Sequence, residues 1–267
     1  MPELAEIKIM SDYINDVCQE KDFTSISFSE SAGRRGLGVT QPTDLQIFRI
    51  SAESRGKELM LSLIQGGEVF MKISFSMGMS GHWLEVPARF EPPKHTHLKF
   101  NAVDLSSLCL IDVRRFARWK VAGEWSPNRG PCPVEDFTEF KHNVLQNLEK
   151  REFTKPIHLV LMNQKYFNGI GNYLRAEILF KAGQDPFMEA REALSSNPAI
   201  IELCGRLPQE AYVLGGGQLK DWENPFEVPV GGFAEWMQCY GRGSCFVDKS
   251  GRRMWYHESQ IETHSSF

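Results

Sequence analysis

The sequence predicts an α+β protein in which a strand-rich first half precedes a helical second half. Runs with strand-like patterns, such as LMLSLI and VFMKISF, follow one another between residues 23 and 122, separated by Gly-Gly and Pro-Pro breaks. Helical periodicity takes over after SPNRGPCP at 126–133, whose proline and glycine content marks a boundary. We therefore expect an antiparallel sandwich or barrel followed by a helical domain.

An amphipathic helix is expected before the strands, at residues 3–19. Ile7, Met10, Ile14 and Val17 recur at three- and four-residue spacing, which places them on one helical face. A proline at the start and acidic residues in the first turn suit a helix N-terminus.

The remaining segments complete the expected organisation. The expected domains are a first domain at 1–126, a linker at 127–133, a helical domain at 134–232 and a finger at 233–267. Helical runs are expected at 134–150, 155–164, 172–182 and 200–213, with a glycine-rich loop at 214–232. The finger would combine a short helix at 233–241 with a closing hairpin.

Composition excludes several classes of protein. The 267 residues are 42% hydrophobic and 24% charged, which is ordinary for a globular chain. No apolar run approaches the ~18 residues of a membrane span, and the start MPELAEIKIM is not expected to be a signal peptide. Six scattered cysteines do not form a disulfide framework and suit a reducing compartment.

The placement of charge matters more than the net charge of −4. Net negative charge argues weakly against nucleic-acid binding, but cationic residues cluster at Arg34-Arg35, at 114–120 and at 249–253. Any one cluster is more typical of a solvated surface. Three clusters, each in a turn or near an aromatic residue, weaken that interpretation.

The stretch MPELAE offers a nucleophile. Removal of the initiator methionine would expose the secondary amine of Pro2, and an α-amine has a pKa of about 8. Attack of this amine on an aldehyde-level carbon gives an iminium, which is an electron sink for covalent catalysis. Glu3 and Glu6 stand beside it for proton transfer. For this stretch alone, the favoured interpretation is a helix-start proline followed by acids that complement the helix dipole.

The phrase NQKYFNGIGNYLRAE places a Gly-x-Gly turn, Gly169 to Gly171, at the start of a helix. Such a turn presents backbone N–H groups to an anion, and Asn172 can add a side-chain hydrogen bond. With the preceding helix it forms a helix–two-turn–helix unit that can clamp a DNA phosphate without reading sequence. The alternative is a plain helical hairpin whose glycines ease packing.

Two further phrases place large side chains on expected loops. FSMGMSGHW contains Met79, and DVRRFARW contains Arg114 and Phe116. Such side chains can fill the gap left by a flipped nucleotide, because inserted wedges offset lost stacking. The ordinary alternative is core Met and Phe with a surface arginine. Lys57, in SRGKELML, is expected at a strand start, where the alternative is an ordinary exposed lysine.

The phrase CYGRGSCFVDKSGRRMWYHESQ looks like part of a zinc finger, but its spacing argues against a metal. Five residues separate its two cysteines and six separate His257 from His264, both wider than in a Cys2His2 site. A second candidate set, in which the neutral amide is a poor zinc ligand, is Cys245, Asp248, His257 and Gln260. We expect no structural metal. A turn at DKSG would close the hairpin, with apolar packing in place of the ion by Phe246, Trp255 and Tyr256.

Together these phrases resemble the Fpg/Nei family of DNA glycosylases and AP lyases. PELAE, RGKEL, GMSG, DVRRFARW, NQKYFNGIGNYLRAEIL and CYGRG…GRRMW occur in the family's order and span nearly the whole chain. The resemblance implies an N-terminal antiparallel β-sandwich with a catalytic N-terminal helix. It also implies a C-terminal helix–two-turn–helix domain with a β-hairpin finger, here zincless like that of the vertebrate Nei-like enzyme.

The resemblance also assigns roles to individual residues. Pro2 matches the nucleophile that attacks C1′ of the damaged nucleotide, Glu3 the adjacent proton-transfer carboxylate and Glu6 the family's second glutamate. Lys57 and Arg252 match residues that contact phosphates near the lesion, and they complete the catalytic set. The DNA-binding set is Lys57, Met79, Arg114, Arg115, Phe116, Gly169, Gly171, Asn172 and Arg252. Glu177 matches a structural acid that orients the N-terminus.

The implied function is excision of oxidised bases through a proline iminium, followed by β,δ-elimination, with no cofactor. The implied partner is double-stranded DNA with oxidised bases or abasic sites. The protein is expected to be a monomer and not to associate with a membrane. The absence of a basic tail or nuclear import run favours a bacterial nucleoid over a eukaryotic nucleus. The alternatives are a catalytically silent damage-binding protein on the same fold and a metalloprotein or ligand-binding sandwich that does not bind DNA.

The sequence departs from the family pattern at three positions. Ala5 replaces a proline, Ala117 a glycine and Asn163 an acid; the first change removes no catalytic group. LGGGQLKDW at 214–222 resembles the loop of Fpg-type members that closes over an oxidised purine, whereas the finger resembles that of the zinc-free vertebrate member. These hints point to different substrates, so the sequence does not rank the lesions.

Overall fold

The computed structural model describes residues 2–29, 47–121, 123–217, 224–228, 231–249 and 251–261. The arginine pair 34–35, His264 and parts of the expected loop at 214–232 lie outside these residues. The chain divides at Ser126–Pro127 into two compact units. Among the described residues, the first unit contains Pro2, 6–126 and 224–227. The second contains Glu3–Ala5, 127–217 and the residues from 228 onward.

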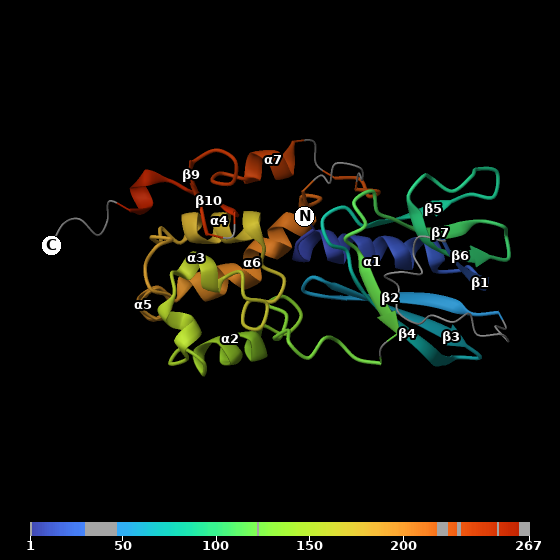
Figure 1. Ribbon diagram of the computed structural model, residues 1–267, viewed down its shortest axis with the longest axis horizontal. Helices are drawn as coiled ribbons and strands as arrows, with labels where there is room; N and C mark the ends of the chain where they lie inside the picture. The colour runs from blue at the N-terminus through green and yellow to red at the C-terminus, as the bar shows by residue number, and fades with distance from the viewer. Residues whose placement is uncertain are drawn as a thin grey trace. The chain divides into compact units, whose positions relative to one another are not determined.

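The first unit contains two four-stranded antiparallel sheets (Figure 1). One sheet has the order β1 (Phe23–Phe28), β6 (Thr96–Ala102), β7 (Ser107–Ile111) and β5 (His82–Val86). The other has the order β2 (Arg49–Arg55), β3 (Glu58–Gln65), β4 (Glu68–Ser76) and β8 (Arg118–Val121).

Aromatic side chains pack between the two sheets. Trp83 of β5 is fully buried and lies edge-on to Phe75 of β4, with ring centroids 5.1 Å apart, and 6.2 Å from the Phe100 ring of β6. A large ring shared between sheets excludes water from the core, in line with sandwich packing. The expected antiparallel sandwich is therefore confirmed over the barrel.

Helix α1 (Leu4–Cys18) is tied to both sheets and agrees with the helix expected at 3–19. The Tyr13 hydroxyl accepts a hydrogen bond of 2.8 Å from the Glu85 N–H of β5. The Asn15 amide makes two hydrogen bonds with the Ala52 backbone of β2, at 2.7 and 2.9 Å. These polar contacts fix the rotation of the helix that carries Glu6.

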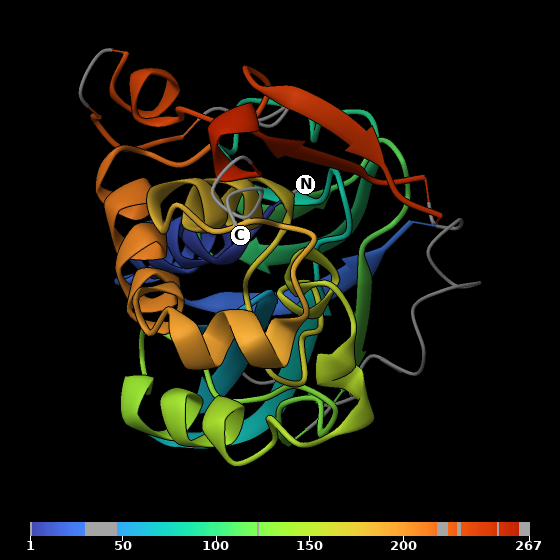
Figure 2. The ribbon, with the colours of Figure 1, turned by 90° about the vertical axis from the view of Figure 1, so that its left-hand side faces the viewer.

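The second unit is helical and ends in a two-stranded hairpin (Figures 1 and 2). Its α-helices are α2 (Phe137–Leu145), α3 (Ile157–Val160), α4 (Asn172–Lys181), α5 (Ala190–Ser196), α6 (Ala199–Val213) and α7 (Gly232–Trp236). Two 3-10 helices are η2 (Arg151–Thr154) and η3 (Glu258–Gln260), and the hairpin joins β9 (Ser244–Val247) to β10 (Arg253–Tyr256).

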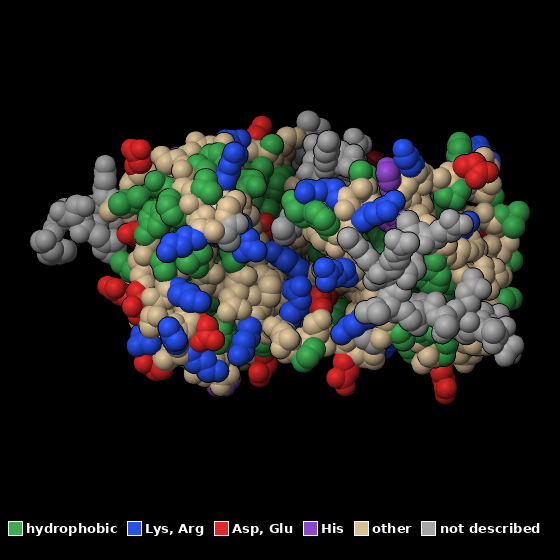
Figure 3. All heavy atoms as spheres, viewed as in Figure 1, with side chains coloured by type: hydrophobic (Ala, Val, Ile, Leu, Met, Phe, Trp, Pro, Cys, Tyr) green, Lys and Arg blue, Asp and Glu red, His purple; other side chains and the backbone are tan. Residues whose placement is uncertain are grey.

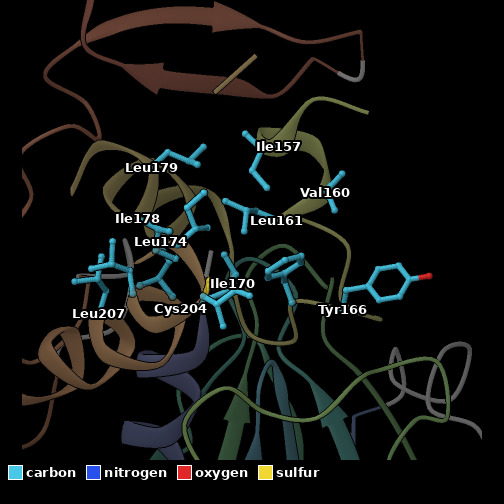
Figure 4. Packing of buried hydrophobic residues seen from close by; sticks show 14 of the residues in the cluster. Ile157, Val160, Leu161, Tyr166, Ile170, Leu174, Ile178, Leu179, Cys204 and Leu207 are labelled. Carbon is cyan, nitrogen blue, oxygen red and sulfur yellow. The ribbon is translucent and has the colours of Figure 1, made fainter. Parts of the chain in front are cut away.

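The core of the second unit lies where α4 and α6 pack. Leu174 and Ile178 of α4 and Cys204 and Leu207 of α6 are all fully buried in one cluster (Figure 4). Their burial agrees with the 3.6-residue periodicity of α4 and α6, which places apolar residues on one face of each helix. Leu4 belongs to the same cluster. This packing fixes the start of α4, where the Gly-x-Gly turn lies.

The helix expected at 155–164 is much shorter in the structure. Only Ile157–Val160 is helical, because Met162 and Asn163 donate to carbonyls three residues back, which tightens and ends the helix. The Asn163 side chain then accepts from the Lys165 N–H at 3.1 Å, which is a typical turn contact. The segment 155–164 is therefore one helical turn followed by tight turns.

Residues 127–133, expected to be a linker, pack into the second unit. The Gly130 N–H donates to the Gln164 carbonyl at 3.0 Å, and Cys132 belongs to the core with 2% of its surface exposed. Asp136 then caps α2, since its carboxylate accepts from the Glu139 N–H.

In the part of the chain that the structure describes, no helix is long and apolar enough to span a membrane.

Candidate functional site

The N-terminal segment enters α1 with its reactive groups buried. Pro2 is buried and lies two residues before the start of α1 at Leu4. Glu6 lies in the first turn of the helix with 1% of its surface exposed. A proline is tolerated here because the first residues of a helix need no backbone N–H partner. The first unit thus contains the expected nucleophile and the expected second glutamate.

The carboxylate of Glu3 caps the N-terminus of α4. Its Oε2 accepts from the Gly171 N–H at 2.7 Å and from the Leu174 N–H at 3.3 Å, and its Oε1 accepts from the Tyr173 N–H at 2.9 Å. Glu3 has 2% of its surface exposed, so these bonds form out of water. A carboxylate at this position satisfies unpaired N–H groups and complements the positive end of the helix dipole.

The Gly-x-Gly turn therefore does not present the N–H groups of its two glycines to an external phosphate, as the sequence suggested. The Gly171 N–H is taken by Glu3, and the Gly169 N–H donates to the Gln164 side chain at 3.0 Å. Gly169 adopts φ 94°, and its carbonyl accepts from the Leu4 N–H at 3.2 Å. The anion that this turn binds in the structure is the chain's own glutamate.

A fully buried arginine connects α4 to the hairpin. The guanidinium of Arg175 donates to the carbonyls of His158 and Arg253, both at 3.0 Å, and to the side-chain oxygen of Asn172. Burial lowers the pKa of Arg175 to about 10, which still leaves it charged near neutral pH. The Arg175 guanidinium donates to Asn172 Oδ1, so Asn172 offers its side-chain NH2 group as a hydrogen-bond donor to other partners.

The role of Arg175 was not predicted from the sequence, although the residue lies in the phrase NYLRAEIL. In NYLRAEIL an arginine stands among residues that are otherwise mostly apolar or aromatic. Such a residue is almost never fully buried unless it is paired. That mismatch was the available signal, although its partners at 158 and 253 could not be read from it.

The hairpin turn fixes the backbone of Arg252. The Arg252 N–H donates to the Asp248 carboxylate, and the Asp248 N–H donates to the Arg252 carbonyl, both at 2.9 Å. Gly251 closes the turn at φ 76°, a conformation that other residues rarely adopt. The Arg252 side chain is exposed at the end of this rigid turn.

Glu177 holds the segment that leads into the hairpin. Its carboxylate accepts from three successive backbone N–H groups, those of Gln238, Cys239 and Tyr240, at 2.8 to 3.0 Å. The resemblance implied that this acid orients the N-terminus. The structure corrects this, because its three backbone contacts are at the entry to the hairpin (Figure 2 shows the hairpin beside α4).

Aromatic rings pack along the hairpin as expected. Phe187 lies edge-on to Phe246 at 5.5 Å and to Tyr256 at 5.4 Å, and Trp255 lies 6.2 Å from Tyr240. His158 adds an imidazole ring 5.6 Å from Phe187. These contacts stabilise the hairpin through apolar burial.

The side chains considered as metal ligands have other partners. Cys245 is exposed, the Asp248 carboxylate binds Arg252, and the His257 ring lies 4.7 Å from Phe180. Gln260 accepts from the His257 N–H and donates to the Gln184 carbonyl. Among the described residues no three His, Cys, Asp or Glu side chains are grouped so as to hold a metal ion.

The first unit presents two adjacent loops with exposed apolar side chains. Met79 is 38% exposed between β4 and β5, and Phe116 is 44% exposed between β7 and β8. The Arg114 guanidinium lies 4.7 Å from the centre of the Phe116 ring. The expected set of Met79, Arg114 and Phe116 is thus exposed rather than in the core.

Two further predicted residues lie in turns. Lys57 is half-buried in the two-residue turn Gly56-Lys57 between β2 and β3, one position before the strand start that was expected. Arg115 is exposed and adopts φ 56°, which is uncommon for a residue other than glycine. Lysine and arginine side chains also lie on the faces of both units shown in Figure 3.

The chain is similar to known proteins along most of its length. Residues 1–119 match the model of the formamidopyrimidine-DNA glycosylase N-terminal domain. Over 287 aligned positions the chain is 36% identical to endonuclease 8-like 1 of Homo sapiens, covering 96% of this chain and 72% of that protein. Over 257 positions it is 29% identical to formamidopyrimidine-DNA glycosylase of Escherichia coli (strain 55989 / EAEC), covering 91% and 89%.

Solved structures share the fold. One is a complex of Lactococcus lactis Fpg with DNA containing an oxidised pyrimidine, with a TM-score of 0.78 and 21% identity over 97% of this chain and 99% of that chain. Another is the same enzyme with abasic-site DNA, with a TM-score of 0.78 and 20% identity over 97% and 98%. The 36% identity to the human relative shows that the chain belongs to the Fpg/Nei family of DNA glycosylases and AP lyases, enzymes of base excision repair.

Proposed function

We propose that this enzyme removes oxidised bases from double-stranded DNA with Pro2 as nucleophile. The observation that carries the proposal is the placement of Pro2 two residues before the start of α1 and next to Glu3, whose carboxylate is fixed by three backbone N–H groups of the α4 N-terminus. A nucleophile next to a rigidly held acid is an arrangement suited to covalent catalysis.

The reaction would proceed in balanced steps. The Pro2 nitrogen attacks C1′, the C1′–N bond to the base breaks, and the base leaves with a proton. The sugar ring opens to an iminium on Pro2, which makes the C2′ proton acidic. Loss of that proton expels the 3′ phosphate, and a second elimination expels the 5′ phosphate. Water then releases the sugar fragment and regenerates the Pro2 amine.

The other residues would hold DNA and move protons. Glu3 and Glu6 are the proposed carboxylates for proton transfer, while Lys57, Asn172 and Arg252 contact phosphates near the flipped nucleotide. Met79, Arg114 and Phe116 would fill the gap in the stack, with Arg115 beside them. Because phosphate contacts carry no sequence information, damage rather than sequence would select the site.

The experiment is borohydride trapping on duplex DNA with one oxidised pyrimidine. We expect a covalent adduct through the N-terminus of the wild-type chain, identified by mass spectrometry of the N-terminal peptide. Pro2→Gly should slow or change the lyase chemistry while DNA binding persists. DNA binding with no adduct from the wild-type chain would instead favour a catalytically silent damage-binding protein.

We also propose that the enzyme acts as a monomer, without membrane association, in the bacterial nucleoid or, in a eukaryote, the nucleus. Sedimentation of the DNA-free protein tests the oligomeric state. A cleavage panel of formamidopyrimidines, 8-oxoguanine, hydantoins and oxidised pyrimidines in one duplex context ranks the lesions.

A further inference from the structure

A buried carboxylate lies beneath the two exposed loops of the first unit. Asp112 follows β7 and has 1% of its surface exposed. Its Oδ1 accepts from the Ser80 hydroxyl at 2.5 Å and from the Arg114 N–H at 3.2 Å, and its Oδ2 accepts from the Ala117 N–H at 2.6 Å. One side chain therefore bonds to both loops, because Ser80 belongs to the Met79 loop and the other two donors to the Phe116 loop.

Ser80 makes a second bond across the loops. Its hydroxyl oxygen accepts from the Arg114 N–H at 3.2 Å while its proton goes to Asp112. Both Ser80 and Asp112 are buried, so water does not compete for these bonds. Ser80, Asp112 and the Arg114 N–H close a small ring of hydrogen bonds, which we name the Asp112–Ser80 clasp.

The backbone of Asp112 is itself held in place. Its carbonyl accepts from His97 Nε2 at 2.9 Å and from the Arg115 N–H at 3.3 Å, and its N–H donates to the His95 carbonyl at 3.1 Å. The clasp is thus anchored to residues at the start of β6 rather than carried on a free loop.

Steric contact supports the same pairing of loops. A Cβ atom on Gly78, which adopts φ +62°, would lie 2.6 to 2.7 Å from the Cβ, carbonyl carbon and carbonyl oxygen of Phe116. A Cβ atom on Gly81 would lie 2.6 Å from the Met77 carbonyl oxygen and 3.1 Å from the Ala117 Cβ. The backbone at Gly78 therefore approaches the Phe116 loop too closely for any residue but glycine, while Gly81 is in tight contact with Met77 of its own loop and lies close to Ala117.

We propose that Asp112 and Ser80 are positioning residues, which hold Met79, Arg114 and Phe116 as one preformed wedge. The proposal rests on the proposed function, in which these three side chains fill the gap left by the flipped nucleotide. Extruding a base costs a few kcal/mol of lost stacking, so a wedge that must first be ordered would add to this barrier. The clasp removes that ordering step before DNA arrives.

The test compares Ser80→Ala and Asp112→Asn with Ser62→Ala, a matched control at a buried serine of β3. Ser80→Ala breaks the bond between loops and leaves the two backbone bonds of Asp112 in place. Asp112→Asn turns one acceptor into a donor that faces an N–H group. Circular dichroism and thermal melting of the full-length variants check that each is folded.

The readouts are single-turnover excision of 5-hydroxyuracil from a duplex, and lyase activity on a single-stranded abasic oligonucleotide. A single strand has no stacked gap to fill. We expect duplex excision to fall roughly 10- to 100-fold in both clasp variants, because small misplacements are costly. Lyase activity on the single strand should stay within about threefold of wild type. The fluorescence rise of 2-aminopurine beside the lesion should slow in parallel with excision.

Equal losses on both substrates would overturn the proposal in favour of a general structural role. Unchanged excision in both folded variants would overturn it as well. The outcome is distinct from failure of the proposed function, in which the wild-type chain and the Ser62→Ala control would be inactive on both substrates.

Discussion

The Oε2 atom of Glu3 lies 2.7 Å from the backbone nitrogen of Gly171, a residue 168 positions further along the chain. Through this bond Glu3, which follows the proposed nucleophile Pro2, becomes part of the helix–two-turn–helix unit. The acid next to the nucleophile is therefore held by the element that the family resemblance assigns to DNA phosphate. Catalytic position and helix packing are thereby coupled.

Replacing Glu3 by glutamine should reduce the free energy of unfolding by about 1–3 kcal/mol. The amide retains the shape but presents an N–H2 group to a backbone N–H of Gly171 or Tyr173. Urea unfolding followed by circular dichroism measures the loss. Glu139→Gln, at an exposed acid in the first turn of α2, is the control and should stay within about 0.5 kcal/mol of wild type. Equal stability of both variants would contradict the capping role.

The stability should decrease between pH 6.5 and pH 4 because of His158. Burial, and then the charge of Arg175, lower the pKa of His158 from 6.5 to about 4. In this window the unfolded chain binds a proton that the folded chain does not, so acid favours unfolding, by on the order of 3 kcal/mol. His158→Phe removes this proton uptake and leaves the backbone carbonyl that Arg175 uses. Urea unfolding at several pH values should therefore show a flatter pH dependence for the variant, and an identical dependence would refute the assignment.

Arg175→Lys should loosen the hairpin although it conserves charge. A lysine is a point donor and cannot reach the His158 and Arg253 carbonyls together, as the planar guanidinium does. We expect a loss of about 1–3 kcal/mol in stability from the unsatisfied buried groups. Faster amide hydrogen exchange across residues 253–256, compared with α2, would locate the effect. Uniform acceleration throughout the unit would point to global destabilisation instead.

Arg252→Ala should weaken DNA binding without changing stability, because the side chain is exposed and its backbone makes the turn contacts. Loss of one phosphate contact should reduce the slope of log Kd against log salt by about one. Fluorescence anisotropy with abasic-site duplex at several salt concentrations measures the slope. Arg206→Ala, at an exposed arginine paired with Glu210 on α6, serves as the matched control. A similar change in slope for both variants would remove the special role of Arg252.

The finger should retain its stability without metal. Cys245→Ser alters an exposed side chain and should change the free energy of unfolding by no more than about 0.5 kcal/mol. Elemental analysis of the purified protein and melting with and without EDTA measure metal content and dependence. Stoichiometric zinc, or a melting temperature that falls with EDTA, would show that the hairpin binds a structural ion.

Local sequence patterns predicted much of the fold. The period of apolar residues located α1, α4 and α6, and strand-like runs between turn residues located β3 and β4. Helix α5 was not expected, since Ala190–Ser196 is short and forms against η2 and α3. Short elements of this kind depend on tertiary packing more than on propensity.

The site was less predictable than the fold because its geometry depends on distant pairs. The phrase PELAE identified Pro2 and Glu3, yet nothing in it shows that Glu3 caps a helix at residue 172. Asp112 had a local signal, since an aspartate two residues before Arg114 can form an Asx turn. Its hydrogen bond to Ser80, 32 positions earlier in the chain, could be identified only in the three-dimensional structure.

The Glu3 cap also constrains the order of events during synthesis. Glu3 leaves the ribosome 168 residues before Gly171 does. At about 5–20 residues per second, Glu3 waits on the order of 10–30 s for its partner. During that interval the acid beside the nucleophile has no helix to cap. The acid beside the proposed catalytic proline therefore acquires its finished surroundings only after residues 171–174 have been translated.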